Sequence, residues 1–201
     1  IHPVRGAREL QDKKQYFLSN KNFSVESDTL YLMKIQTDRI SSKLSSSTKK
    51  LSLPDHYFLS PNGHQYNGQE LSTNDSRVLG GIIDEDWIQF VNHSMDTSTG
   101  TCGIYHGTIY NYNSNNPFIE SKIISDSILD LGYPNIVSTG INYNETECVI
   151  GFNFTSVIDT NGMACVYFKE DEYSGIKKLH TGEKAIDRLS GNIERWGDYS
   201  G

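Results

Sequence analysis

Residues 90–105 read Phe-Val-Asn-His-Ser-Met-Asp-Thr-Ser-Thr-Gly-Thr-Cys-Gly-Ile-Tyr, and residues 152–167 read Phe-Asn-Phe-Thr-Ser-Val-Ile-Asp-Thr-Asn-Gly-Met-Ala-Cys-Val-Tyr. Both stretches hold a run beginning at Phe, an Asp-Thr pair followed by Gly, and a second run that carries an aliphatic-Tyr pair. Tyr105 of the first copy corresponds to Tyr167 of the second, 62 residues later. A looser third copy occupies residues 16–31. The chain therefore contains a repeated structural unit.

The Asp-Thr-Gly pattern predicts a turn in each copy. An Asp carboxylate accepts backbone N–H bonds across a turn, and glycine adopts positive φ without strain. The flanking runs are short and rich in aromatic and β-branched residues, which is typical of strands. We therefore expect β-hairpins that turn near Asp96 and Gly100 and near Asp159 and Gly162.

Further strand-like runs flank each hairpin, so that a unit contains about four strands. We place the units at about residues 1–61, 62–125 and 126–190, with the start of another at 191–201. The Ser/Lys-rich residues 40–50 are expected to form an exposed loop. Repeating four-stranded units predict an all-β protein and, more specifically, a partial β-propeller of antiparallel blades. An ordinary two-sheet sandwich is the alternative.

Three blades and a fragment do not close a ring. Leaving a blade face of roughly 500 Å² of apolar area in water costs about 12 kcal/mol, which is as much as the whole stability of a typical domain. We therefore expect the remaining blades of a longer chain, or a partner chain, to cover the open edge. The first residue is Ile1 rather than Met, which favours a processed or internal piece of a longer protein.

Composition excludes several classes of function. The formal net charge of −7 at pH 7 argues against nucleic acid and against an anionic membrane surface. No apolar run approaches the ~18 residues of a membrane helix. The three cysteines, Cys102, Cys148 and Cys165, form no CxxC pair, so we expect free buried thiols and no zinc site. A disulfide between two of them in an oxidising compartment is the alternative. No nucleotide-binding motif is present, and no cofactor is expected.

Several motifs carry a family resemblance: residues 187–191 and 195–201, residues 129–134, residues 74–78 and residues 103–107. They resemble segments of large secreted, sialidase-like β-propeller proteins of Bacteroidota, many of them cargo of the type IX secretion system. The resemblance extends from about Val4 to Gly201. It implies a secreted or cell-surface protein, of a family that is mostly uncharacterised.

The same resemblance draws attention to arginines, because sialidase-like propellers clamp a carboxylate with arginines on their inner strands. Arg5, Arg77 and Arg195 recur near the starts of three units, and Asp198 follows Arg195. Arg77, Arg195 and Asp198 are therefore candidate ligand-binding residues. The alternative, which we favour, is that each arginine pairs with a local carboxylate or a backbone carbonyl. His106, which stands alone on a predicted strand, is expected to be a hydrogen-bonded structural residue.

The polar loop at residues 110–116 is a second candidate site. It carries Tyr110 and Tyr112 among asparagines and serine, and tyrosine offers flat contact area together with a hydroxyl group. These features favour an extracellular binding or scaffold module for a glycan or protein ligand, with no assigned catalytic residue. The alternatives are a sialidase-like glycoside hydrolase and a structural part of a larger surface assembly.

Overall fold

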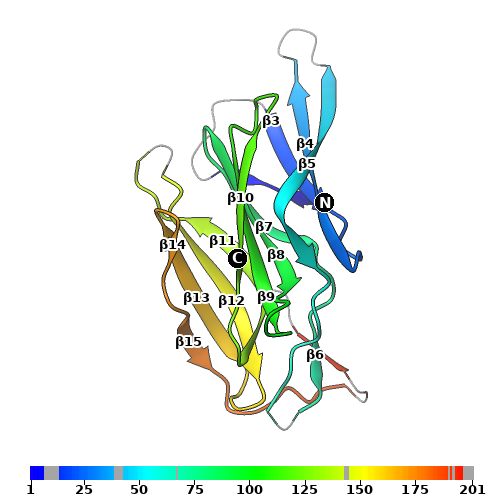
Figure 1. The fold of residues 1–201 in the computed structure, drawn as a ribbon, viewed down its shortest axis with the longest axis vertical. Helices are drawn as coiled ribbons and strands as arrows, with labels where there is room; N and C mark the ends of the chain where they lie inside the picture. Colours follow the sequence, from blue (N-terminus) through cyan, green and yellow to red (C-terminus); the bar gives the residue numbers. More distant parts are fainter. Residues whose placement is uncertain are drawn as a thin grey trace.

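The fold of the chain consists of strands. The computed structural model describes residues 1–6, 14–38, 43–66, 68–142, 145–189, 191 and 193–196, and every regular element in them is a β-strand (Figure 1). The prediction of an all-β protein with antiparallel sheets of about four strands is confirmed. Within these residues, no helix is present that has the length and apolar character needed to cross a membrane.

Three main sheets follow one another along the chain. The N-terminal sheet has the order β1-β3-β4-β5, built from β1 (His2–Pro3), β3 (Lys14–Asn20), β4 (Glu26–Thr37) and β5 (Leu44–Phe58). The central sheet has the order β10-β9-β8-β7-β2, built from β2 (Arg5–Gly6), β7 (Val78–Ile83), β8 (Trp87–Met95), β9 (Cys102–Tyr110) and β10 (Phe118–Ile124).

The C-terminal sheet has the order β11-β12-β13, built from β11 (Leu129–Ser138), β12 (Cys148–Ser156) and β13 (Gly162–Lys169). Two short strands, β14 (Glu172–Tyr173) and β15 (Lys177–Thr181), both pair with β13. All pairs in the three main sheets are antiparallel except β2 with β7. A small parallel pair joins β6 (Glu70–Ser72) to β16 (Ile193–Arg195).

The strands β7, β8 and β9 of the central sheet are buried on both faces. Because successive side chains of a strand point to opposite faces, Ile88 and Phe90 of β8 pack toward the N-terminal sheet, and Trp87 and Val91 pack toward the C-terminal sheet. The sheet therefore separates two hydrophobic cores. Nearly every residue of β8 and β9 is buried, polar residues such as Gln89 and Asn92 included, whereas the edge strand β10 alternates between exposed and partly buried residues.

The two repeated hairpins place their turns at the expected residues. Between β8 and β9, the carboxylate of Asp96 accepts a hydrogen bond from the Ser98 backbone N–H at 2.8 Å, and Gly100 has a φ of +75°. Between β12 and β13, the Asp159 carboxylate accepts the Thr160 N–H at 2.9 Å and pairs with Lys178.

Glycine is required at position 162 for a different structural reason than at position 100. Its φ lies outside the left-handed region, and a Cβ there would come within 2.2 Å of the carbonyl oxygen of His180 on β15. The close approach of β15, and not positive φ, requires glycine at this position.

The prediction of an exposed loop over residues 40–50 is wrong for the residues that the structure describes. Residues 44–50 belong to β5, which pairs with β4 from Leu44 opposite Thr37 to Leu51 opposite Leu30. Their side chains are mostly exposed, as expected on an edge strand, and serine and lysine there discourage pairing with other chains. Residues 44–50 show no apolar alternation, and backbone hydrogen bonds to β4 therefore hold them in the strand conformation.

A third, smaller core closes one end of the molecule. Trp196 follows β16, is 5% exposed, and packs edge-on against Tyr133, with their ring centroids 6.1 Å apart. A Cβ on Gly132 would lie 2.6 Å from the Trp196 ring, so glycine leaves the space that the indole fills. The residues expected to begin another unit thus pair with β6 over 193–195, and residues 197–201 lie outside the described residues.

Candidate binding site

Arg77 is bound by a carboxylate two residues before it. Its Nε donates to Oδ1 of Asp75 at 2.7 Å and its Nη2 donates to Oδ2 at 2.6 Å, and the Asp75 side chain is fully buried. Burial alone raises the pKa of Asp75, but hydrogen bonds from Arg77 and Asn22 outweigh it and hold the pKa below its ordinary value. This is the local pairing that the sequence favoured for the arginines.

The other residues of the expected arginine site lie on other strands or outside the described residues. Arg195 is an exposed residue of β16, opposite Ser72 of β6, whereas Arg77 directly precedes β7 of the central sheet. Arg5 lies on β2, opposite Ile82. Asp198 is outside the described residues.

Tyr112 is a core residue rather than an exposed one. It is 6% exposed and packs edge-on against Tyr16 at 5.1 Å between ring centroids. The hydroxyl of Tyr16 donates to the Asn113 side chain at 2.7 Å, and the Lys49 ammonium group donates to the carbonyl of Ser114. These contacts fasten the loop to the N-terminal sheet, and Tyr112 therefore offers no open ring face to a ligand.

Tyr110 occupies a different position from Tyr112. It ends β9 and stacks on Phe118, the first residue of β10, with ring centroids 5.8 Å apart and an interplanar angle of 25°. Phe118 is 57% exposed, so the side of its ring that faces away from Tyr110 is open to solvent. Together the two rings form an aromatic surface at the start of the edge strand of the central sheet.

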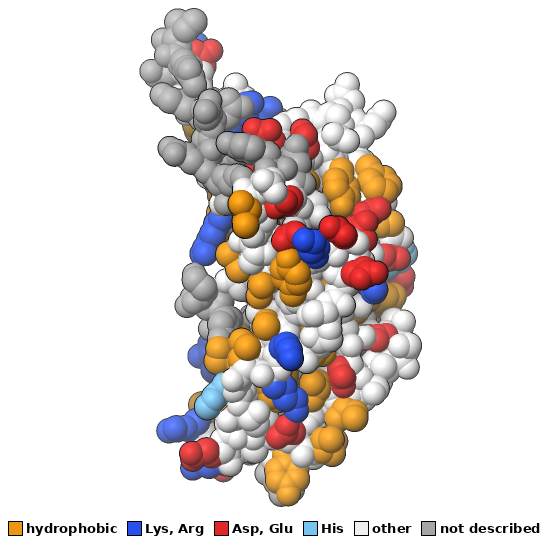
Figure 2. Space-filling view, turned by 90° about the vertical axis from the view of Figure 1, so that its left-hand side faces the viewer, with side chains coloured by type: hydrophobic (Ala, Val, Ile, Leu, Met, Phe, Trp, Pro, Cys, Tyr) orange, Lys and Arg blue, Asp and Glu red, His pale blue; other side chains and the backbone are white. Residues whose placement is uncertain are grey.

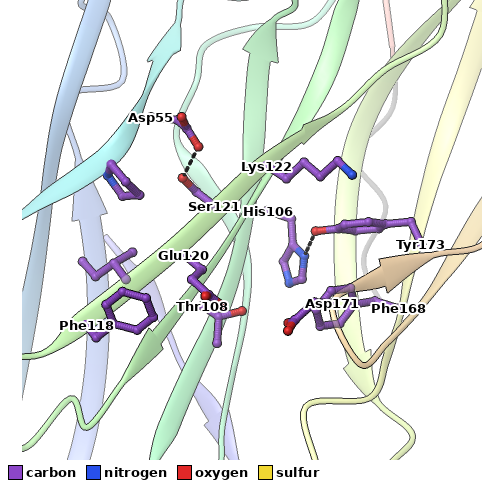
Figure 3. A pocket seen from close by; sticks show the side chains of 12 residues that line it. Asp55, His106, Thr108, Phe118, Glu120, Ser121, Lys122, Phe168, Asp171 and Tyr173 are labelled. Carbon is purple, nitrogen blue, oxygen red and sulfur yellow. Dashed lines mark hydrogen bonds between the residues drawn. The ribbon is translucent and has the colours of Figure 1, made fainter.

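A pocket of about 490 Å³ follows this edge strand (Figure 3). It is bounded by β5, by β9 and β10, and by the hairpin of β13 and β14, so that all three main sheets contribute. Its lining residues are Pro54, Asp55, His106, Thr108, Phe118, Ile119, Glu120, Ser121, Lys122, Phe168, Asp171 and Tyr173.

His106 lies at the buried side of the pocket. It is 2% exposed, and its Nδ1 shares a hydrogen bond of 2.6 Å with the hydroxyl of Tyr173. Burial lowers the pKa of His106 to about 3, so the imidazole is neutral at physiological pH. Its Nε2 is buried and has no hydrogen-bond partner among the described residues. His106 is thus a hydrogen-bonded residue, as expected, but one ring nitrogen remains available.

Charged groups lie around the same pocket. Glu120 and Lys122 project from β10, and Asp171 lies at the turn between β13 and β14, with its carboxylate directed toward Thr108 and Glu120 in Figure 3. Burial first, and then the charges of Glu120 and Asp171, raise the pKa of Tyr110 to about 12. The Lys122 ammonium group lies 5.2 Å from the centroid of the Tyr173 ring. The pocket therefore offers hydrogen-bond donors and acceptors beside aromatic rings.

Sequence reasoning did not identify Glu120, Lys122, Asp171 or Tyr173 as a group. The one local signal is the alternation of Phe118, Glu120 and Lys122 on an edge strand, which places the three side chains on one face. Residues 168–173 join them only through the packing of two sheets.

Metal and thiol chemistry find no support in the described residues. They contain no group of three or more His, Cys, Asp and Glu side chains that could hold a metal ion. The three cysteines are free thiols, and burial raises the pKa of Cys148 to about 12, which makes that thiol a poor nucleophile.

Comparison with known protein families, with curated proteins and with solved structures finds no match for this chain. The resemblance to secreted sialidase-like propellers therefore stays a prediction from sequence.

Proposed function

We propose that the three main sheets are consecutive blades of a β-propeller. The sheets follow one another in chain order, and most of their strands pair with the next strand along the chain. The central sheet packs between the other two, as a blade packs between its neighbours. In Figure 1 the three sheets lie side by side with their strands running in broadly similar directions.

In this proposal, further blades or a partner chain cover the outer faces of the two terminal sheets. The outer face of the N-terminal sheet carries Phe17, Tyr31, Met33 and Ile35, which alternate with core residues and are only partly buried. On the side of the C-terminal sheet, hydrophobic side chains form separate groups among charged and polar ones (Figure 2).

We further propose that the chain is a binding module of a secreted or cell-surface protein, with a glycan or protein ligand and no catalytic role. The observation that carries this proposal is the pocket along β10, where a buried imidazole nitrogen without a partner lies beside aromatic and charged side chains. A buried polar atom without a protein partner is normally satisfied by water or a ligand. The extracellular location rests on the family resemblance alone.

A glycan array combined with turnover assays tests this function. The chain is applied to immobilised neutral, acidic and amino-containing glycans and is incubated separately with fluorogenic glycosides, including a sialoside. We expect binding to a subset of glycans and no release of fluorophore. Release from the sialoside would establish the hydrolase alternative, and the absence of both binding and turnover would overturn the glycan-binding function.

A further inference from the structure

We propose that the pocket along β10 binds a neutral saccharide, with Glu120 and Asp171 accepting hydrogen bonds from its hydroxyl groups and His106 Nε2 completing the contacts at the buried side. This inference rests on the proposed binding function and names its site and ligand class. Three features of the described residues support it: a strained turn, a buried imidazole nitrogen without a partner, and charged groups around aromatic rings.

The strained turn holds Asp171 at the pocket. Lys169 pairs with Glu172, so Glu170 and Asp171 form a two-residue hairpin turn. Their φ values are 50° and 63°, as a type I′ turn requires at both central positions. Such turns strongly prefer Asn-Gly, because residues with larger side chains adopt positive φ only at a cost. Glu170 in particular adopts positive φ at a cost, and such backbone strain is characteristic of functional sites.

A buried polar atom without a partner lies at the pocket, on the same face of the central sheet as Thr108 and Glu120. Gln89, Thr108 and Glu120 stand opposite one another on β8, β9 and β10, and His106 lies on the same face of β9 as Thr108. Of the residues that line the pocket, His106 has a buried Nε2 for which the described residues provide no hydrogen-bond partner. Leaving a buried polar group unpaired is unfavourable. Water or a polar ligand atom is therefore expected beside His106 Nε2.

The charges around the pocket disfavour an anionic ligand. An anion would meet the carboxylates of Asp55, Glu120 and Asp171, and a cation would meet Lys122, whose ammonium group already lies over the ring of Tyr173. A hydroxyl-rich ligand both donates and accepts, so it can use the carboxylates, the lysine and the Thr108 hydroxyl together. The open ring face of Phe118 suits the apolar C–H face of a sugar ring.

Two substitutions in the strained turn separate binding from folding. Asp171→Gly relieves the strain and removes the carboxylate, whereas Glu170→Asn relieves strain and leaves Asp171 in place. We expect both variants to unfold at a higher temperature than the parent chain. Calorimetric titration uses lactose, cellobiose, maltose and diacetylchitobiose as probes. Asp171→Gly is expected to weaken binding about tenfold or more, as the loss of a charged hydrogen bond predicts, and Glu170→Asn is expected to bind like the parent.

A second pair of variants tests the aromatic surface. Phe118→Ala removes an exposed ring of the pocket, and Phe23→Ala removes a ring that is 71% exposed in the turn between β3 and β4. Only Phe118→Ala is expected to weaken binding of the same disaccharides. Unchanged binding in both Asp171→Gly and Phe118→Ala would overturn this site while leaving the binding function intact. Preference for sialyllactose or for choline over all neutral sugars would overturn the ligand class.

Discussion

Replacing Trp196 by alanine is expected to lower the free energy of unfolding by about 3–5 kcal/mol. The indole is 5% exposed and fills the space between Gly63, Gly132 and Tyr133, so its removal leaves a cavity that these backbone segments cannot easily close. It also joins the end of the described chain to the body of the fold. Equilibrium urea unfolding of the parent and the variant measures the difference, and a loss below about 1 kcal/mol would contradict this role.

Gly132→Ala provides the matched control for Trp196. In the parent chain the new methyl group would lie 2.6 Å from the indole ring, so we expect the substitution to destabilise the fold. In the Trp196→Ala background the same methyl group meets empty space and is expected to cost much less. A coupling of about 0.5–3 kcal/mol between the two substitutions follows for residues in direct contact. Additive effects would mean that the indole does not occupy this space.

Acid is expected to destabilise the protein through His106. Burial lowers the pKa of this histidine from 6.5 to about 3 in the folded chain. Between these two values the unfolded chain binds a proton that the folded chain does not. The stability is therefore fully present above about pH 6.5 and is lost progressively as the pH falls toward 3, by up to about 4–5 kcal/mol. About 2 kcal/mol of this loss falls between pH 7 and pH 5.

His106→Gln isolates this contribution because it removes the titrating group. The difference in unfolding free energy between pH 7 and pH 5 is expected to be about 2 kcal/mol smaller in the variant than in the parent. His180→Gln, which replaces an exposed histidine of β15, is the control for the loss of an imidazole as such. An identical pH dependence in His106→Gln and the parent would show that the imidazole is not buried in its neutral form.

Local signals in the sequence identified the hairpins of the central and C-terminal sheets. Each hairpin depends on its turn residue, Asp96 or Asp159, and on the aromatic and β-branched runs beside it. Because these residues lie within a few positions of one another, the pattern is visible in the sequence. The edge strand β5 was missed because its exposed serines and lysines follow no apolar alternation. Its pairing with β4 depends on backbone hydrogen bonds, which any residue type except proline can donate and which composition therefore does not indicate.

The candidate site was much harder to predict than the strands. Asp55, Glu120 and Tyr173 meet in one pocket only because three sheets pack together, and no sequence spacing relates them. Tyr112 was a candidate ligand-binding residue because it stands among asparagines and serine, yet it packs against Tyr16 in the core. The residue types in the loop indicated that tyrosines bind a ligand there. Tertiary packing decides which of Tyr110 and Tyr112 is placed to contact a ligand.

Chemical-shift mapping tests the assignment of the binding site most directly. The ¹⁵N-labelled chain is titrated with the disaccharide that binds it most tightly, and backbone amide shifts are followed to saturation. We expect the largest shifts at Glu120 and Lys122 on β10 and at Asp171 in the β13–β14 turn, with β4 of the N-terminal sheet unchanged. Shifts confined to the N-terminal sheet, or no shifts at all in β10 and the β13–β14 turn, would contradict the site.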